Sequence, residues 1–209
     1  MNKKLKTWIF IVWALIIFSL LVLFYLAATT ATMKKPAIYL YPIEDCRVAV
    51  QVSVNGELTK TIPEYGDGWD VFATKEGIIE DKYDYLFYEA NLRKIELPNE
   101  GWIVEYENLD SWFDENLKLM GLNDKELSQF KEYWMEELPE ENYYLIKLLS
   151  DEFLEENMAL SISPEPDILI RREFYFKSLS EKIEIANPEI ITPQRDGFVV
   201  VEWGGILED

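Results

Sequence analysis

Two glutamates, Glu89 and Glu202, stand beside aromatic residues in a setting that suits acid–base chemistry. Glu89 follows the run YDYLFY, and Glu202 lies in VVVEWGG. Retaining glycosidases hold two carboxyl groups ~5–5.5 Å apart, and apolar neighbours raise the pKa of the one that acts as general acid. If the fold brings both into one cleft, we expect a carboxylate-dependent hydrolase acting on glycans. The alternative is that both face solvent or pair with an arginine such as Arg171 or Arg172.

The stretch EYGDGWD, residues 64–70, offers a second kind of chemistry. Its three carboxylates, Glu64, Asp67 and Asp70, fall within seven residues. Calcium is bound by six to eight oxygens, often from closely spaced carboxylates. The stretch lacks the residue order of an EF-hand, so the alternative is a turn in which Gly66 and Gly68 supply positive φ while the acids stay solvated. We expect no cofactor unless Ca²⁺ binds at this loop.

Aromatic residues beside glycines form the third group of candidates. Trp102 and Trp203 each neighbour a glycine, and Trp69 lies with Tyr65 in the acidic loop. Exposed near strand ends, these rings would provide a platform for carbohydrate or peptide. The alternative is that they pack in the core or cap it.

The composition excludes several catalytic classes. The chain contains no histidine and a single cysteine, Cys46, which removes Ser-His-Asp and Cys-His nucleophilic catalysis, imidazole zinc sites and an internal disulfide. No Gly-rich phosphate loop or dinucleotide fingerprint occurs. Any catalysis would therefore depend on carboxylates, tyrosines, lysines or a hard cation, and the balance favours a protein that is not an enzyme.

The N-terminal region predicts a membrane anchor. Residues 8–28 carry no charge, and as a helix they would span roughly 31 Å, which matches a bilayer core. We expect a basic cytoplasmic start at 1–7, a transmembrane helix at 8–28 and a short linker at 29–35; a cleaved signal peptide is the alternative. The lysines at the start favour a single-pass signal-anchor protein of the cell membrane with residues 36–209 outside.

The remainder of the chain is strongly acidic. All 39 acidic residues follow residue 35, and the whole chain has a formal net charge of −19. Such a surface repels nucleic acid and anionic lipid headgroups, and it attracts cations or cationic partners. Partners are therefore expected to be the membrane, through residues 8–28, and an envelope protein or a carbohydrate, but not nucleic acid.

Periodicity predicts one acidic α+β domain over residues 36–209. Alternating valines at 48–54, followed by Asn55-Gly56, indicate a β-hairpin with residues 57–62. Residues 109–120 and 124–138 carry apolar stripes at helical spacing, with a capping box at Asn123 and Glu126. They predict a central αα-hairpin packed on a sheet that combines both halves of the chain. The further strand candidates are residues 38–41, 69–74, 83–90, 143–149, 168–179 and 197–203.

Six ordered motifs resemble those of a largely uncharacterised family of bacterial proteins that are often exported or membrane-anchored. They are KPAIYLYP, the Tyr-x-x-Gly-Trp of YGDGW, YDYLFYEA, LKLMGLNDKEL with EYWMEEL, SPEPD and GFVVVEWGG. The resemblance implies a bacterial source and one domain after the anchor, and it carries no activity or catalytic residue. We expect a membrane-tethered, non-catalytic binding or interaction domain at the cell envelope, with the glycan hydrolase as the alternative.

Overall fold

The computed structural model describes residues 8–19, 31–93 and 95–208. The chain divides into two compact units, Met1–Thr30 and Ala31–Asp209. The second unit begins five residues before the predicted domain boundary. Ala31 starts strand β1 (Ala31–Tyr41), so most of the segment predicted as a linker at 29–35 belongs to the sheet.

The predicted transmembrane helix is wrong. In the first unit, residues 8–19 are helical. Among the described residues, no helix is both long enough and apolar enough to cross a membrane. The assignment as a single-pass, signal-anchored membrane protein with residues 36–209 outside depends on that helix, so it is wrong as well. The rest of the predicted span, together with residues 1–7, lies outside the described residues.

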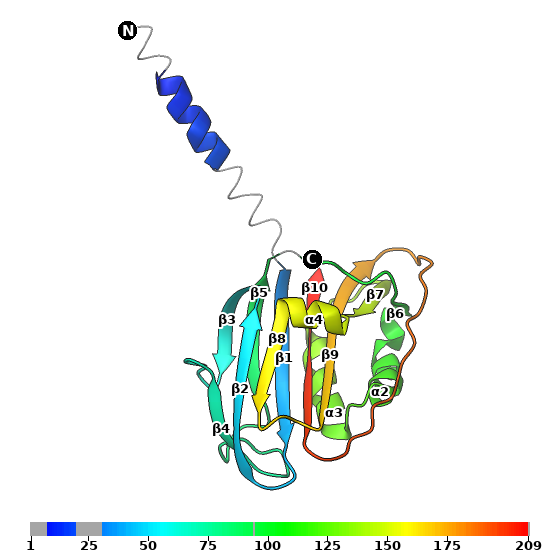
Figure 1. Cartoon of the computed structure of the whole chain (residues 1–209). Helices are drawn as coiled ribbons and strands as arrows, with labels where there is room; N and C mark the ends of the chain where they lie inside the picture. The colour runs from blue at the N-terminus through cyan, green and yellow to red at the C-terminus, as the bar shows by residue number, and fades with distance from the viewer. Residues whose placement is uncertain (1–7, 20–30, 94, 209) are drawn as a thin grey trace. The chain divides into compact units, whose positions relative to one another are not determined.

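Strands of the second unit form two sheets over its described residues (Figure 1). The larger sheet has seven strands, and all its neighbouring pairs are antiparallel except β9 and β10. In spatial order it contains β3 (Gly56–Ile62), β5 (Leu86–Leu92), β1, β10 (Val199–Glu208), β9 (Ile168–Leu179), β7 (Tyr143–Leu148) and β6 (Trp102–Glu105). The smaller sheet contains β4 (Trp69–Ala73), β2 (Cys46–Val54) and β8 (Met158–Ser163).

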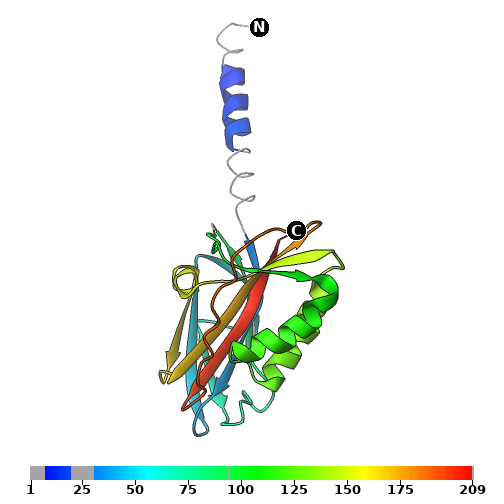
Figure 2. The ribbon, with the colours of Figure 1, turned by 90° about the vertical axis from the view of Figure 1, so that its right-hand side faces the viewer.

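The large sheet is covered on both faces. Figure 2 shows helices α2 (Leu109–Leu119) and α3 (Asp124–Glu137) on one side of β9 and β10, with the small sheet on the other. Helix α4 (Asp151–Asn157) immediately precedes β8. One core therefore lies between the sheets, and a second lies between the large sheet and the helices.

The αα-hairpin is confirmed. Asn123 accepts from the backbone N–H of Glu126, whose side chain accepts from the backbone N–H of Asn123. Gly121, at φ +97°, turns the chain between the helices. The apolar stripes of both helices bury against the sheet, where Phe130 packs near Phe174 and Trp203. Local caps and periodicity were sufficient to predict this element.

The predicted β-hairpin at Asn55-Gly56 is wrong. β2 pairs with β4 and β8 in the small sheet, whereas β3 pairs with β5 in the large one. Asn55 forms the corner between them: its N–H donates to Asn157 O, and its carbonyl accepts from Arg93 N, both at 2.9 Å. β2 and β3 each have one apolar face that must be buried. Placing β2 in the small sheet and β3 in the large sheet buries both faces, as a hairpin would have done.

The close backbone approach at the corner between β2 and β3 predicts that only glycine is tolerated at position 56. A Cβ added to Gly56 would lie 1.9 Å from the backbone oxygen of Asn91, so Gly56→Ala should lower the free energy of unfolding by about 3 kcal/mol or more. Gly66→Ala is the matched control, since its Cβ would meet nothing within 4 Å and it carries only the left-handed backbone cost of about 1 kcal/mol. Urea denaturation of the two variants tests this, and equal losses would contradict the tight corner.

Candidate functional site

The two glutamates predicted as a catalytic pair lie on opposite faces of the large sheet. Tyr88 belongs to the core between the sheets, and its hydroxyl donates to Glu202 Oε1 at 2.8 Å. Because side chains alternate along a strand, Glu89 points to the other face, towards the helices. The prediction that Glu89 and Glu202 share a cleft is therefore wrong.

Glu202 belongs to a buried cluster with two residues of the neighbouring strand. Arg171 Nε donates to Glu202 Oε2 at 2.6 Å, and Arg171 Nη2 donates to Met158 O at 2.6 Å. Strands β9 and β10 run parallel with Arg171 opposite Glu202, which creates this pair. Glu202 is fully buried, so the arginine and Tyr88 replace the hydration that its carboxylate has lost.

Glu173 is the unusual member of this cluster. It is fully buried, and neither of its carboxyl oxygens has a hydrogen-bond partner among the described residues. Burial raises its pKa well above the ordinary value, the nearby Glu202 carboxylate raises it further, and Arg171 opposes both. Burial therefore favours the protonated form of the Glu173 carboxyl in the folded protein.

This burial predicts a pH-dependent penalty from Glu173. In the unfolded chain the carboxyl ionises near pH ~4.3, so above that pH the folded state retains a proton that the unfolded state has released, and the free energy of unfolding falls as pH rises. Glu173→Gln, which cannot ionise, should be more stable than the wild type at pH 8, with the gain closing towards pH 4. Urea denaturation at pH 4, 6 and 8 measures this. Exposed Glu132→Gln is the control, and a gain independent of pH would contradict the assignment.

The acidic loop is organised by its aromatic residues. Glu64, Asp67 and Asp70 are all exposed, Asp70 pairs with Arg47 at 3.0 Å, and the described residues contain no group of three metal-ligating side chains. By contrast, the Tyr65 hydroxyl accepts from Val52 N at 2.8 Å and contacts Val52 O at 3.2 Å. The pairing of β2 with β4 stops at Val50. Beyond that point, the Tyr65 hydroxyl provides the contacts to the backbone N–H and C=O of Val52.

Tyr65 should accordingly matter more than the acids for stability. Tyr65→Phe leaves the part-buried Val52 N–H without its acceptor and should cost about 1–3 kcal/mol, whereas exposed Asp67→Asn should stay within about 0.5 kcal/mol of the wild type. Thermal unfolding of both variants, with EDTA and with millimolar calcium, measures this. A wild-type midpoint that rises with calcium and stays fixed in Asp67→Asn would instead restore a cation site.

Of the two interpretations of the tryptophans, the platform is wrong and packing in the core is confirmed. The exposed fractions of Trp69, Trp102 and Trp203 are 3%, 7% and 0%. Trp69 packs in the core between the sheets, edge-on to Tyr65 with ring centroids 4.9 Å apart, whereas Trp102 and Trp203 lie in the core beneath the helices. These rings support the fold and present no common surface to a ligand.

A cavity of about 310 Å³ beside β5 and α3 combines lysines with aromatic rings. We call it the lysine–aromatic pocket, lined by Lys35, Lys60, Lys82, Tyr83, Tyr85, Phe87, Tyr133 and four other residues that include Asp84 and Glu89. The lining side chains come from β1, from β3, from β5 together with the loop before it, and from α3. These four segments are distant in sequence and converge on the pocket.

Lys35 lies at the centre of this pocket. Its Nζ donates to the Tyr85 hydroxyl at 2.7 Å and lies 4.6, 4.7 and 5.6 Å from the ring centroids of Tyr85, Phe87 and Tyr133. Its backbone adopts φ +59°, where β1 shifts register between Lys34 and Ala37. A left-handed conformation costs a non-glycine residue energy and is concentrated at functional sites.

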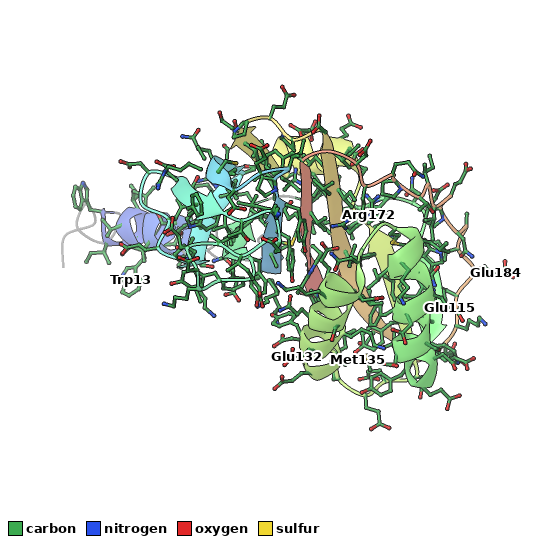
Figure 3. The ribbon with its side chains drawn as sticks, turned by 90° about the horizontal axis from the view of Figure 1, so that it is seen from below. Trp13, Glu115, Glu132, Met135, Arg172 and Glu184 are labelled. Atoms are coloured by element: carbon green, nitrogen blue, oxygen red, sulfur yellow. The ribbon has the colours of Figure 1, made fainter. Side chains whose placement is uncertain are left out.

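The pocket differs from the rest of the surface in charge. Lys35, Lys60 and Lys82 form no ion pair within the described part of the chain, although the protein has 39 acidic residues. Elsewhere, acidic side chains such as Glu115, Glu132 and Glu184 project outward at the periphery (Figure 3). Three lysines without carboxylate partners therefore form a cationic site on an acidic protein.

The carboxylates in the pocket do not form an acid–base pair. Asp84 accepts from Lys125 at 2.6 Å and from Gln129 at 3.0 Å, and the hydrogen bond from Lys125 lowers the pKa of Asp84 below its ordinary value. A general acid needs a raised pKa, so Asp84 is unsuited to assist Glu89. The arrangement suits binding through charge and ring faces rather than hydrolysis.

Sequence reasoning missed all three lysines. Each resembles an ordinary solvated lysine in the linear sequence, and Lys35 falls in the segment predicted as a linker. The one local signal is Lys82 beside the aromatic run YDYLF, a pattern that by itself predicts only a strand. Convergence depends on the pairing of β3 and β1 with β5, which no local pattern specifies.

Comparisons with known proteins leave the interpretation to the structure itself, since no family model, no curated protein and no solved structure matches this chain.

Proposed function

We propose that this chain is a non-catalytic binding domain that holds an acidic carbohydrate at the lysine–aromatic pocket. The observation that carries the proposal is the convergence of Lys35, Lys60 and Lys82, which have no carboxylate partner among the described residues, around aromatic rings. Ammonium groups pair with carboxylates, and ring faces provide apolar surface for the face of a sugar. The proposal keeps the interaction class expected from sequence without the membrane tether.

The three lysines differ in burial, so we assign them different roles in binding. Lys35 is partly buried and fixed among three rings, so it is preorganised at the base of the pocket. Lys60 and Lys82 are exposed and lie over Phe87 and Tyr83 at 5.1 and 4.6 Å. An acidic sugar entering the pocket would meet these two ammonium groups first.

The glycan hydrolase alternative has less support. Its proposed pair is separated by the sheet, and Glu202 is fully buried and hydrogen-bonded to Arg171 and Tyr88. Asp84, the remaining carboxylate beside Glu89, is engaged by Lys125. Binding without turnover is therefore the function that the geometry favours.

Calorimetric titration of the full chain with tetragalacturonate tests the proposal. We expect saturable binding that weakens at high salt because exposed charges are screened, and much weaker binding of the methyl-esterified tetrasaccharide, which keeps the sugars but loses the charges. Lys60→Gln combined with Lys82→Gln should weaken binding roughly threefold to tenfold. Lys182→Gln, at an exposed lysine outside the pocket, should leave it unchanged.

Three results would overturn the proposal. Equal binding of the methyl ester would remove the role of the lysines. Equal binding of tetraglutamate, which has similar charge and no sugar, would reduce the site to a general polyanion site. Release of reducing ends during incubation would show an enzyme instead of a binding domain.

A further inference from the structure

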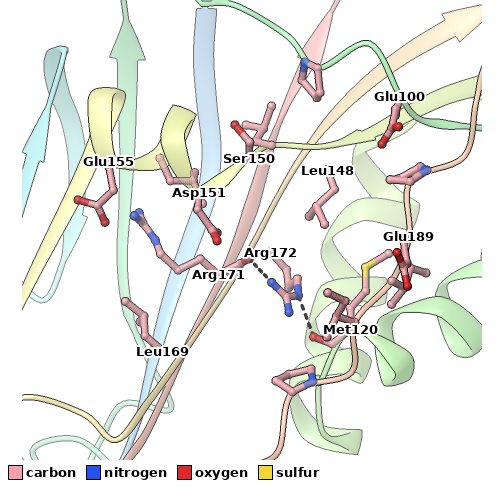
Figure 4. A pocket seen from close by; sticks show the side chains of 17 residues that line it. Glu100, Met120, Leu148, Ser150, Asp151, Glu155, Leu169, Arg171, Arg172 and Glu189 are labelled. Atoms are coloured by element: carbon pink, nitrogen blue, oxygen red, sulfur yellow. Dashed lines mark hydrogen bonds between the residues drawn. The ribbon is translucent and has the colours of Figure 1, made fainter.

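A second cavity, of about 700 Å³, lies between α4, β9 and the extended segment 188–193. We call it the α4 groove. Figure 4 shows Asp151 and Glu155 of α4 beside Arg171 and Arg172 of β9. Its volume falls within the ~300–1,000 Å³ of small-molecule sites. It shares no lining residue with the lysine–aromatic pocket.

The base of the α4 groove has one guanidinium group with unused donors, that of Arg172. The neighbouring Arg171 is 6% exposed and points to the other face of β9, where it donates to Glu202 and Met158 O. Arg172 directs Nε to Met120 O and Nη1 to Arg171 O, both at 2.8 Å, and pairs with no carboxylate within 4 Å in the described chain. Guanidinium groups bind carboxylates through paired N–H donors.

The opposite side of the groove has carboxylates. Asp151 and Glu155 are spaced i, i+4 on α4 and so share one face of that helix. Both are exposed and form no ion pair among residues 31–93 and 95–208. The charge of Asp151 acts on Arg172 and raises the pKa of its guanidinium, against the larger lowering by burial. The two groups thus face the same space without forming a salt bridge.

Apolar walls separate the charges. Leu148, Leu154, Leu169 and Ile190 line the same cavity. Leu169 is 41% exposed, unlike the buried Leu154 at 1%. A purely anionic ligand would meet the carboxylates of α4, and a purely cationic ligand would meet Arg172. A zwitterion with an apolar side chain complements all three parts of the lining.

From these observations we infer that the α4 groove binds an apolar α-amino acid. The ligand carboxylate accepts from the guanidinium donors of Arg172 that Met120 and Arg171 leave unused, and the ammonium group pairs with Asp151 and Glu155. The aliphatic side chain packs against the leucine and isoleucine walls. This site is separate from the lysine–aromatic pocket, so either assignment can fail without the other.

The test is calorimetric titration of the full chain with L-leucine and two truncated analogues. 4-Methylpentanoate lacks the ammonium group, and 3-methylbutylamine lacks the carboxylate. We expect saturable binding of leucine and at least tenfold weaker binding of both analogues. Absence of leucine binding, or equal binding of either analogue, would overturn the inference.

Variants of α4 supply the matched controls. Asp151→Asn should weaken leucine binding at least fivefold, and Glu155→Gln should act in the same direction. Glu152→Gln removes the same charge from the same helix but lies outside the groove, so it should leave affinity unchanged. Equal effects of Asp151→Asn and Glu152→Gln would show a general charge effect and refute recognition by Asp151. Circular dichroism confirms that each variant is folded.

Discussion

Burial of both faces of the seven-stranded sheet is the constraint on which the rest of the structure depends. At the centre of the sheet, β10 is buried without interruption from Val199 to Ile206. A charged side chain in such a strand must find its partner inside the protein. The parallel alignment of β9 with β10 meets this need by placing Arg171 beside Glu202. Removing one partner from a buried pair leaves an uncompensated charge. The two residues are therefore needed together, and β9 and β10 must keep the register that places them side by side.

The same constraint leaves room for ligands only where the covering layers end. On the helix side, the rings of Tyr85 and Phe87 extend to the margin of α3, and there they line the lysine–aromatic pocket. On the other side, the core beneath the small sheet draws on β1, β5 and β10, with Tyr175 from β9, and the α4 groove opens over Leu169 and Arg171 of β9. The centre of the sheet provides stability, and the margins provide the surfaces that can bind.

Local signals in the sequence were sufficient for some elements and misleading for others. The strand at 168–179 and the αα-hairpin were predictable because periodicity and caps are local. The hairpin at Asn55-Gly56 failed because a turn signal specifies a change of direction, not the strand that pairs next. The apolar run at 8–28 predicted a span by composition, whereas no helix among the described residues is long and apolar enough to cross a membrane. The lysine–aromatic pocket was not predictable, since pairing between distant strands assembles it.

The contrast between an acidic surface and a cationic pocket has a consequence for selectivity. At physiological ionic strength the Debye length is ≈ 8 Å, so the lysines lining the pocket act on a bound ligand far more strongly than distant carboxylates do. A long polyanion would extend beyond the pocket and meet exposed acids such as Glu132 and Glu115, each contact opposing association. A short anionic ligand would contact the lysines without reaching the acids outside the pocket. If the proposed binding function holds, the net charge of −19 would therefore select against long polyanions and favour a short anionic ligand.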